Sequence, residues 1–214
     1  MVRMASNANR FPDFTFRPRN ARILAIVAII LCAIGVVAAV VGGVHWFGVL
    51  LWLTGAFLAY VLWVHPKVVL TDDAVAFVNP FTDVNIPWDA IINVETKYSL
   101  TVQTPTQKYG AWAAPAPGAT SSLRETSRTE REYKRAEGKD KSKFTTMRPG
   151  DQTSTDSGLV ANQIRARLAD KAERGLLDID KTETAVVTRS VNVLHVATLL
   201  VLIAATVVAG YLVP

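Results

Sequence analysis

The chain has 214 residues, of which 50% are apolar and 19% are charged, and its formal net charge is +5. An ordinary soluble domain has about a quarter charged residues. The apolar residues here collect in three dense blocks, which excludes a wholly soluble domain and a wholly disordered chain. The single cysteine, Cys32, excludes a disulfide framework or a multi-thiolate metal site within the chain.

The first 64 residues form a tail followed by two apolar runs. Residues 1–22 are a basic tail with several arginines. The runs at 23–41 and 46–64 each have about the length that a helix needs to cross a bilayer. One continuous helix over both runs would be about twice as long as the bilayer is thick. The segment 23–64 therefore predicts a transmembrane hairpin that turns at Gly42 and Gly43.

A third apolar run, residues 191–213, predicts a third transmembrane helix. Basic residues precede the first run, follow the second at Lys67 and precede the third at Arg189, whereas the hairpin tip has none. By the positive-inside rule, the N-terminus and the middle segment are cytoplasmic and the C-terminus is outside. The expected location is the cell membrane, crossed several times.

Small residues recur on one face of each predicted span. Such residues let helices approach closely in lipid. The expected use is packing of the three helices on one another, and the alternative is a seam of a homo-oligomer. In the three spans these faces contain Ala25, Ala28, Cys32, Gly35, Ala39 and Gly42; Gly48, Trp52, Gly55 and Ala59; and Ala205 and Ala209.

Residues 65–118 are rich in strand-forming residues. The run Ser99 to Thr104 alternates polar and apolar residues, as a half-buried strand does. Asp72 and Asp73 predict a turn rather than a cation site, and Trp88 is expected to anchor a small core. Short connections between the strands predict antiparallel pairing. Six strands are expected, at 66–71, 74–79, 81–86, 91–95, 98–104 and 107–114.

Residues 119–154 are polar and have few large apolar side chains, so they predict a disordered excursion. The segment 124–148 is rich in basic residues with acidic residues between them. It is either a solvated linker or a surface for anionic lipid headgroups. The candidate lipid-facing residues are Arg124, Arg128, Arg131, Lys134, Arg135, Lys139, Lys141 and Lys143.

An amphipathic helix is expected over residues 155–176, followed by a linker at 177–190. Thr155 is a suitable helix start and Gly175 a suitable stop. Ala161, Ile164, Leu168 and Ala172 share the apolar face, and the pattern places Arg167 and Arg174 away from it. This face is expected to pack on the sheet.

Three sequence stretches resemble a known family. They are PKVVLTDDAVAFVNP at residues 66–80, IPWDAI at 86–91 and LTVQT at 100–104. They resemble a bacterial PH-like domain, and most of all the short version in actinobacterial membrane proteins of the low-molecular-weight protein antigen type. The resemblance covers about residues 65–114. The resemblance implies a fold, and it implies no catalytic residues in this chain.

The fold class expected is an α+β membrane protein, with three transmembrane helices plus a small PH-like antiparallel β-sheet domain capped by one amphipathic helix. No enzyme motif such as HExxH, CxxC or GxSxG is present, and no cofactor is expected. The spans contain no Asp, Glu, Lys or Arg, which disfavours a transporter. The topology allows His195 to lie near His65, and the two are interpreted as interfacial imidazoles rather than as a metal site.

The function expected is that of a non-enzymatic membrane protein that presents its PH-like domain to a protein or peptide partner. The first alternative is recognition of anionic lipid headgroups through the basic residues of 124–148. The second is an intramembrane enzyme or transporter. The expected partners are the lipid bilayer, an unidentified protein and, in the alternative use of the small-residue faces, a second copy of the chain. No nucleic acid is expected.

Overall fold

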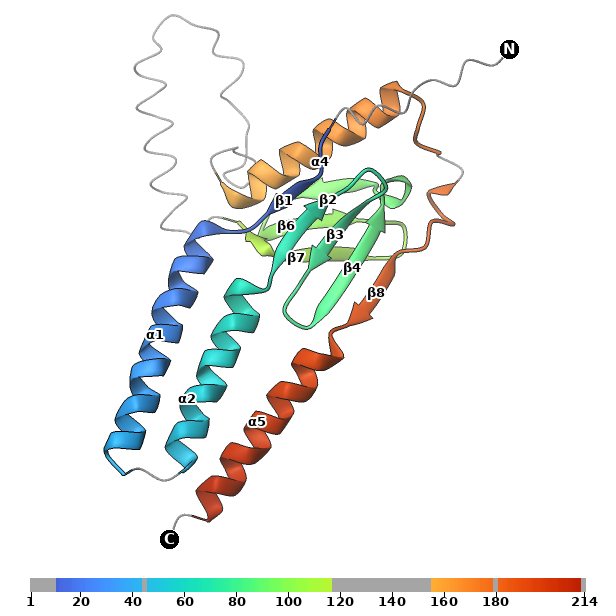
Figure 1. Ribbon diagram of the computed structural model, residues 1–214. Helices are drawn as coiled ribbons and strands as arrows, with labels where there is room; N and C mark the ends of the chain where they lie inside the picture. The colour runs from blue at the N-terminus through green and yellow to red at the C-terminus, as the bar shows by residue number, and fades with distance from the viewer. Residues whose placement is uncertain (1–10, 44–45, 117–154, 179–180, 213–214) are drawn as a thin grey trace, which may run out of the picture.

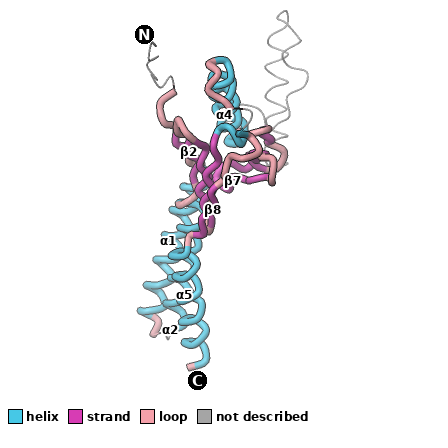
Figure 2. Tube along the Cα trace, turned by 90° about the vertical axis from the view of Figure 1, so that its right-hand side faces the viewer, coloured by secondary structure: helices cyan, strands magenta, loops and turns pink. Residues whose placement is uncertain are grey.

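A computed structural model describes residues 11–43, 46–116, 155–178 and 181–212. Three long helices lie side by side at one end of the molecule, and strands and a fourth helix lie at the other end (Figure 1). In a view turned by 90°, the strands lie between the three long helices and α4 (Figure 2).

The three long helices are α1 (Arg19–Val41), α2 (Trp46–Ala59), which continues as the π-helix η1 (Tyr60–Val64), and α5 (Val193–Tyr211). Each of the three is long and apolar enough to cross a membrane. The turn after α1 contains Gly43 with φ of 65°, a conformation that glycine adopts without steric cost. The predicted hairpin at Gly42 and Gly43 is therefore present.

Helix α1 packs on α2 through its small residues, as the first of the two alternatives predicted, whereas the buried residues of α5 are His195 and Thr206 rather than Ala205 and Ala209. Ala25, Cys32, Gly35 and Ala39 are buried on one face of α1. A Cβ atom at Gly35 would overlap the ring of Trp52 on α2. Helix α2 lies between α1 and α5, and the hydroxyl groups of Thr54 and Thr206 are 3.3 Å apart across its contact with α5.

The six predicted strands are all present and pair antiparallel. They form part of two sheets, of order β1-β2-β3-β4-β8 and β5-β6-β7. Their bounds are β2 (Lys67–Leu70), β3 (Ala74–Val78), β4 (Thr82–Pro87), β5 (Asn93–Glu95), β6 (Ser99–Gln103) and β7 (Lys108–Pro115), with the 3-10 turn η2 (Trp88–Ala90) after β4.

One hydrophobic core fills the space between the two sheets and α4. Trp88 is 4% exposed and its indole nitrogen donates to the carbonyl of Thr71 at 3.1 Å, so its predicted core role is confirmed. Asp72 and Asp73 lie in the turn between β2 and β3, as predicted. The largest fully buried side chains of the core are Phe77, Leu70, Ile86, Leu100, Ile164, Val68, Val75, Val102 and Val160.

Helix α4 (Asp156–Glu173) begins and ends where the sequence predicted. The Thr155 hydroxyl accepts a hydrogen bond from the Gly158 amide at 3.1 Å, and Gly175 ends the helix with φ of 64°. The placement of Arg167 was wrong, because its side chain is buried and only 3% exposed. A residue far away in the sequence covers it, as described below.

Two strands were not predicted. Strand β1 (Phe14–Phe16) lies within the expected basic tail of residues 1–22, and it pairs with β2. Strand β8 (Thr188–Val191) begins within the expected linker at 177–190, and it pairs with β4. The chain on either side of the PH-like core therefore adds one strand to each end of the first sheet.

Candidate interaction site

The predicted basic site falls outside the described residues. Arg124, Arg128, Arg131, Lys134, Arg135, Lys139, Lys141 and Lys143 all lie within 117–154, which the structure does not describe. The site is therefore built from the junction where the sheets meet the three long helices.

Trp112 on β7 links the sheet β5-β6-β7 to η1, at the end of the second long helix, through a hydrogen bond. Its indole nitrogen donates to the carbonyl of Leu62 in η1 at 2.8 Å. The π-helix η1 departs from the hydrogen-bond pattern of an α-helix, and π-helical segments are frequent at functional sites. The ring itself remains 56% exposed, so it also forms part of the surface at this junction.

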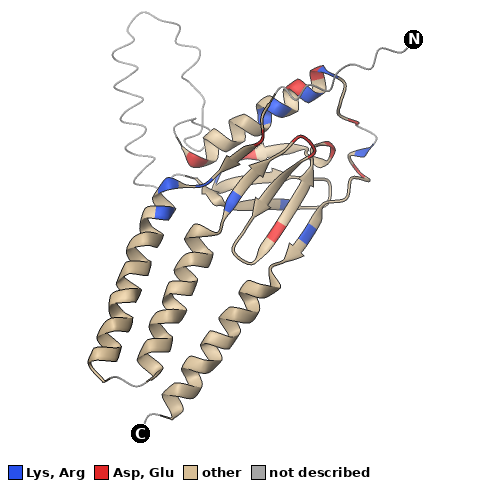
Figure 3. Ribbon diagram, viewed as in Figure 1, with Lys and Arg blue, Asp and Glu red and all other residues tan. Residues whose placement is uncertain are grey.

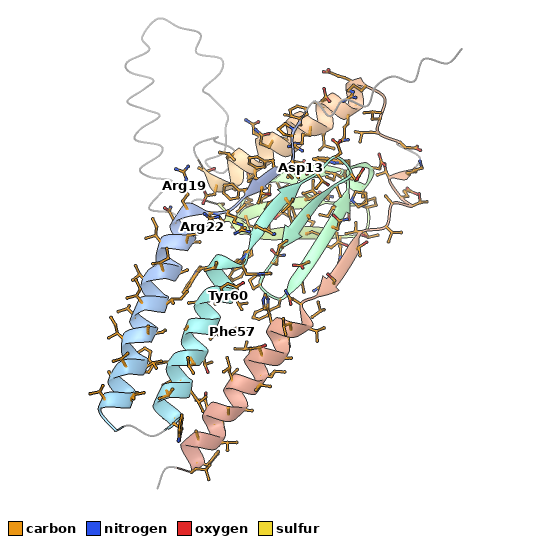
Figure 4. All side chains as sticks on the ribbon, viewed as in Figure 1. Asp13, Arg19, Arg22, Phe57 and Tyr60 are labelled. Carbon is orange, nitrogen blue, oxygen red and sulfur yellow. The ribbon has the colours of Figure 1, made fainter. Side chains whose placement is uncertain are left out.

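The two histidines meet at the other side of the junction, as the expected topology allows. The rings of His65 and His195 are edge to face, with centroids 4.4 Å apart. Nδ1 of His195 donates to the carbonyl of Pro80 at 3.1 Å, which fixes the tautomer of that ring. Phe57 of α2 and Tyr60 of η1 also contact the His195 ring, and both lie toward the end of the second long helix that is next to the sheets (Figure 4).

Burial lowers the pKa of His65, and the neighbouring His195 lowers it further, while Asp83 opposes the shift. Nε2 of His65 and Oδ1 of Asp83 are buried and have no hydrogen-bond partner among the described residues. No group of three or more His, Cys, Asp or Glu side chains in the described ranges could hold a metal ion. The pair is thus a packing contact that joins α5 to the sheet.

Basic side chains surround the junction. Figure 3 shows that the long helices carry Lys or Arg only at the end next to the sheets. Arg19 and Arg22 lie at this end of α1 (Figure 4). Arg17 lies two residues before α1, Lys67 begins β2 three residues after η1, and Arg189 lies in β8 shortly before α5.

An open cavity of about 1100 Å³ lies beside this junction. We call it the junction groove. Helix α1 and η1 supply one side, and β7, the turn between β3 and β4, and the start of α4 supply the other. It is lined by Pro18, Asn20, Ala21, Leu24, Leu62, Trp63, Pro66, Asn79, Pro80, Phe81, Thr82, Ser99, Gly110, Ala111, Trp112, Ala113, Pro115, Ala116, Thr155 and Asp156.

Side chains cover both edges of the second sheet. At the β5 edge, the carbonyl of Val94 accepts a hydrogen bond from Arg165 at 2.8 Å, and its amide donates to the Asn93 side chain at 2.8 Å. At the β7 edge, the Asn79 side chain accepts from the amide of Trp112 and donates to the carbonyl of Gly110. Neither edge offers this backbone to another strand.

The β1 edge of the first sheet is held by the buried Arg167. Its guanidinium donates to the carbonyl of Pro12 at 2.6 Å and to that of Leu70 at 3.4 Å. The same group lies 5.4 Å from the centre of the Phe11 ring. Burial lowers the pKa of Arg167, and Asp13 and Asp72 oppose the shift.

The β8 edge is different, because all of its residues are exposed. The amide of Asn192 donates to the carbonyl of Phe81 at 2.9 Å, in register with the pairing of Ser190 and Asp83. Since successive residues of a strand turn their backbone groups to opposite sides, Ser190 faces β4, whereas Arg189 and Val191 face outward. Strand β8 ends the order of its sheet, so no described strand pairs with these outward groups.

Sequence reasoning missed β8 and the groove. An exposed strand has no alternation of polar and apolar residues, so periodicity gives no signal for it. The groove is made by segments far apart in the chain. The one available signal was the exposed aromatic residue Trp112 in a strand next to a predicted span.

Comparison with known proteins agrees with this geometry. No curated protein and no solved structure matches the chain significantly. Residues 65–169 match the family model described as a bacterial PH domain. The match covers β2 to β7 and most of α4, and it leaves out β1 and β8. Residues 65–169 of this chain are thus similar to a bacterial PH domain, and the flanking segments add two strands to its first sheet.

Proposed function

We propose that the chain is a membrane-anchored, non-enzymatic interaction module that binds a protein or peptide partner along the outer edge of β8. A bacterial PH domain suggests an interaction module, and the described residues offer no cluster of metal-ligating side chains. Helices α1, α2 with η1, and α5 are proposed to cross the cell membrane. Their large exposed apolar side chains support this, because a water-soluble surface seldom carries so many.

The PH-like domain is proposed to lie on the cytoplasmic side, with the C-terminus outside. Arg17, Lys67 and Arg189 flank the three helices at the end that carries the sheets, and positive residues concentrate on the cytoplasmic side. The resemblance of residues 65–114 to the actinobacterial low-molecular-weight protein antigen type supports a position of the domain next to a membrane hairpin, and the basic residues support its side. In intact cells, an amine reagent that cannot cross the membrane should leave Lys67 unlabelled.

The observation that carries the partner site is the contrast between β8 and the other sheet edges. Side chains cover the backbone at the edges of β5 and β7, and Arg167 anchors the segment that leads into β1. Only β8, among the described strands, has all its residues exposed. An exposed strand edge can accept an extended peptide through main-chain hydrogen bonds.

The test uses the fact that successive residues of β8 direct their backbone groups alternately toward β4 and away from it. A photo-crosslinking amino acid in place of Arg189 should trap a specific polypeptide in native membranes. Val191→Pro removes an outward amide and should abolish this product, whereas Val191→Thr keeps the amide and should retain it. If no polypeptide is trapped, or if Val191→Pro has no effect on trapping, β8 is not the partner site.

The alternative proposal is recognition of anionic lipid headgroups. The basic side chains around the junction favour it, because cations close to an anionic leaflet gain about 1 kcal/mol each. The eight predicted residues from Arg124 to Lys143 would add to this surface. Charge reversal at those eight positions should then weaken binding to anionic vesicles, and high salt should do the same. Unchanged vesicle binding would end this alternative.

A second copy of the chain is also proposed as a partner, through a surface other than the small-residue faces of the helices. The small-residue face of α1 is occupied by α2, with Gly35 against Trp52. A homo-oligomer would therefore have to use the outward faces of α1 or α5, which carry larger apolar side chains.

A further inference from the structure

No residue of β8 lines the junction groove, so the groove is a surface separate from the proposed partner site. Its wall contains apolar side chains from both parts of the molecule, namely Leu24 and Leu62 from the helices and Phe81 and Trp112 from the sheets. Its volume of about 1100 Å³ slightly exceeds the usual range of small-molecule pockets, which is about 300–1000 Å³. It therefore has room for a long apolar group.

The groove begins within the apolar helices. Leu24 and Leu62 belong to the segments that are long and apolar enough to cross a membrane. Leu24 lines the groove and is also 50% exposed, next to the exposed Ile23 and Val27 of α1. The apolar wall is thus continuous with the surface of α1 that would face lipid chains.

Charge at the groove changes with distance from the helices. Arg19 and Arg22 are exposed in the first turn of α1 and flank the lining residues Asn20 and Ala21 in the sequence, although they do not line the groove themselves. They have no ion-pair partner among the described residues. Asp156, at the start of α4, is the only acidic lining residue described, and burial raises its pKa. Arg19 and Arg22 therefore favour an anionic group beside the start of α1.

We infer that the junction groove binds one acyl chain of an anionic phospholipid from the adjacent leaflet, with the headgroup beside Arg19 and Arg22. This inference rests on the proposed insertion of the helices in a membrane and is independent of partner binding at β8. The acyl chain leaves the bilayer along α1 and lies against β7. A polypeptide segment is the competing occupant, because β7 also presents Trp112 to the groove.

The experiment uses the full chain in vesicles of phosphatidylglycerol that carries a photoactivatable diazirine in one acyl chain. Labelled residues are mapped by mass spectrometry of peptides. Labels are expected on the exposed outer face of α5, at Leu200 and Val201, because this face contacts the bilayer. The inference additionally predicts labels on Trp112 and its neighbours in β7, within the PH-like domain.

Two variants fill the groove, and a third is their matched control. Ala21→Phe and Asn20→Phe add an aromatic ring to the lining, and Asn20 is exposed, so the second variant should not affect folding. Ala33→Phe places the same ring on an exposed position of α1 outside the groove. A ring that displaces two or three methylene groups should lower labelling of β7 by roughly tenfold, with labelling of α5 unchanged.

The outcomes are distinct. Loss of β7 labels in both groove variants, with labels kept in Ala33→Phe, supports the inference. Absence of β7 labels in the unmodified chain, or β7 labels that the groove variants do not change, would overturn it. Labels on α5 in the same sample show that the helices are inserted, so this failure is separate from a failure of the membrane proposal. Equal labelling of β7 by the phosphatidylcholine analogue would overturn the role of the two arginines.

Discussion

The two end strands of the first sheet occupy equivalent places in the topology and differ in almost every other respect. Both lie beside a long apolar helix, since β1 ends three residues before α1 and β8 ends two residues before α5. Phe14 and Phe16 of β1 pack on the core, and Arg167 anchors the preceding segment. All residues of β8 are exposed. Position at the end of the sheet therefore does not decide how firmly a strand is held; the two strands differ in the burial of their side chains and in the anchor beside β1.

Removal of the anchor at β1 should have the largest effect. Arg167→Met leaves the carbonyls of Pro12 and Leu70 without their donor and is expected to lower the free energy of unfolding by about 2–3 kcal/mol. Thermal unfolding of the full chain in detergent measures the loss, and limited proteolysis of residues 11–17 measures release of the strand.

The matched control for this change is Arg174→Met. Arg174 is partly exposed and pairs with Asp170 on the same helix, so its loss should cost about 0.5 kcal/mol and should not expose β1. Equal losses in the two variants would contradict the anchoring role of Arg167.

Breaking the pairing of β8 should have an intermediate effect. Ser190→Pro removes an amide that faces β4 and should lower stability by about 1–2 kcal/mol, whereas Val191→Pro removes an outward amide and should cost less than about 0.5 kcal/mol. Hydrogen exchange of the β4 amides would detect the difference. A larger loss in Val191→Pro would show that the outward side of β8 is not free.

Contact between α5 and α2 should contribute less. Thr206→Val removes the hydroxyl that lies 3.3 Å from that of Thr54 and should cost about 0.5–1 kcal/mol. Thr198→Val, on the same helix, is the control. Thermal unfolding in detergent measures the stability of both variants. An equal loss in both would show that the contact of Thr206 with Thr54 does not stabilise the packing of α5 on α2.

The smallest effect is expected from pH, at the contact of α5 with the sheet. Because burial and His195 lower the pKa of His65 in the folded chain, the unfolded chain binds the proton more readily. Stability should therefore be complete above the ordinary histidine pKa of 6.5 and should fall as the pH decreases below it. Unfolding temperatures measured across this range should show the decrease, and His65→Phe should reduce it.

The sequence was sufficient to predict the elements whose buried residues follow a regular pattern. The six inner strands, Trp88 and the caps of α4 follow from period-two alternation and from local turn and cap chemistry, which neighbouring residues determine. Arg167 was misplaced because a charge on a helix normally faces water, and the segment that covers it lies about 150 residues earlier in the chain. The candidate sites could not be derived in this way, because β8 and the junction groove depend on the relative position of sheets and helices.

Only Asn192 separates β8 from α5. If α5 spans a bilayer, as proposed, β8 and α5 would move together about the contact of His195 with Pro80. A thinner bilayer makes such a helix tilt further. That tilt would pull β8 relative to β4, so the thickness of the surrounding lipid would be converted into the availability of a binding edge.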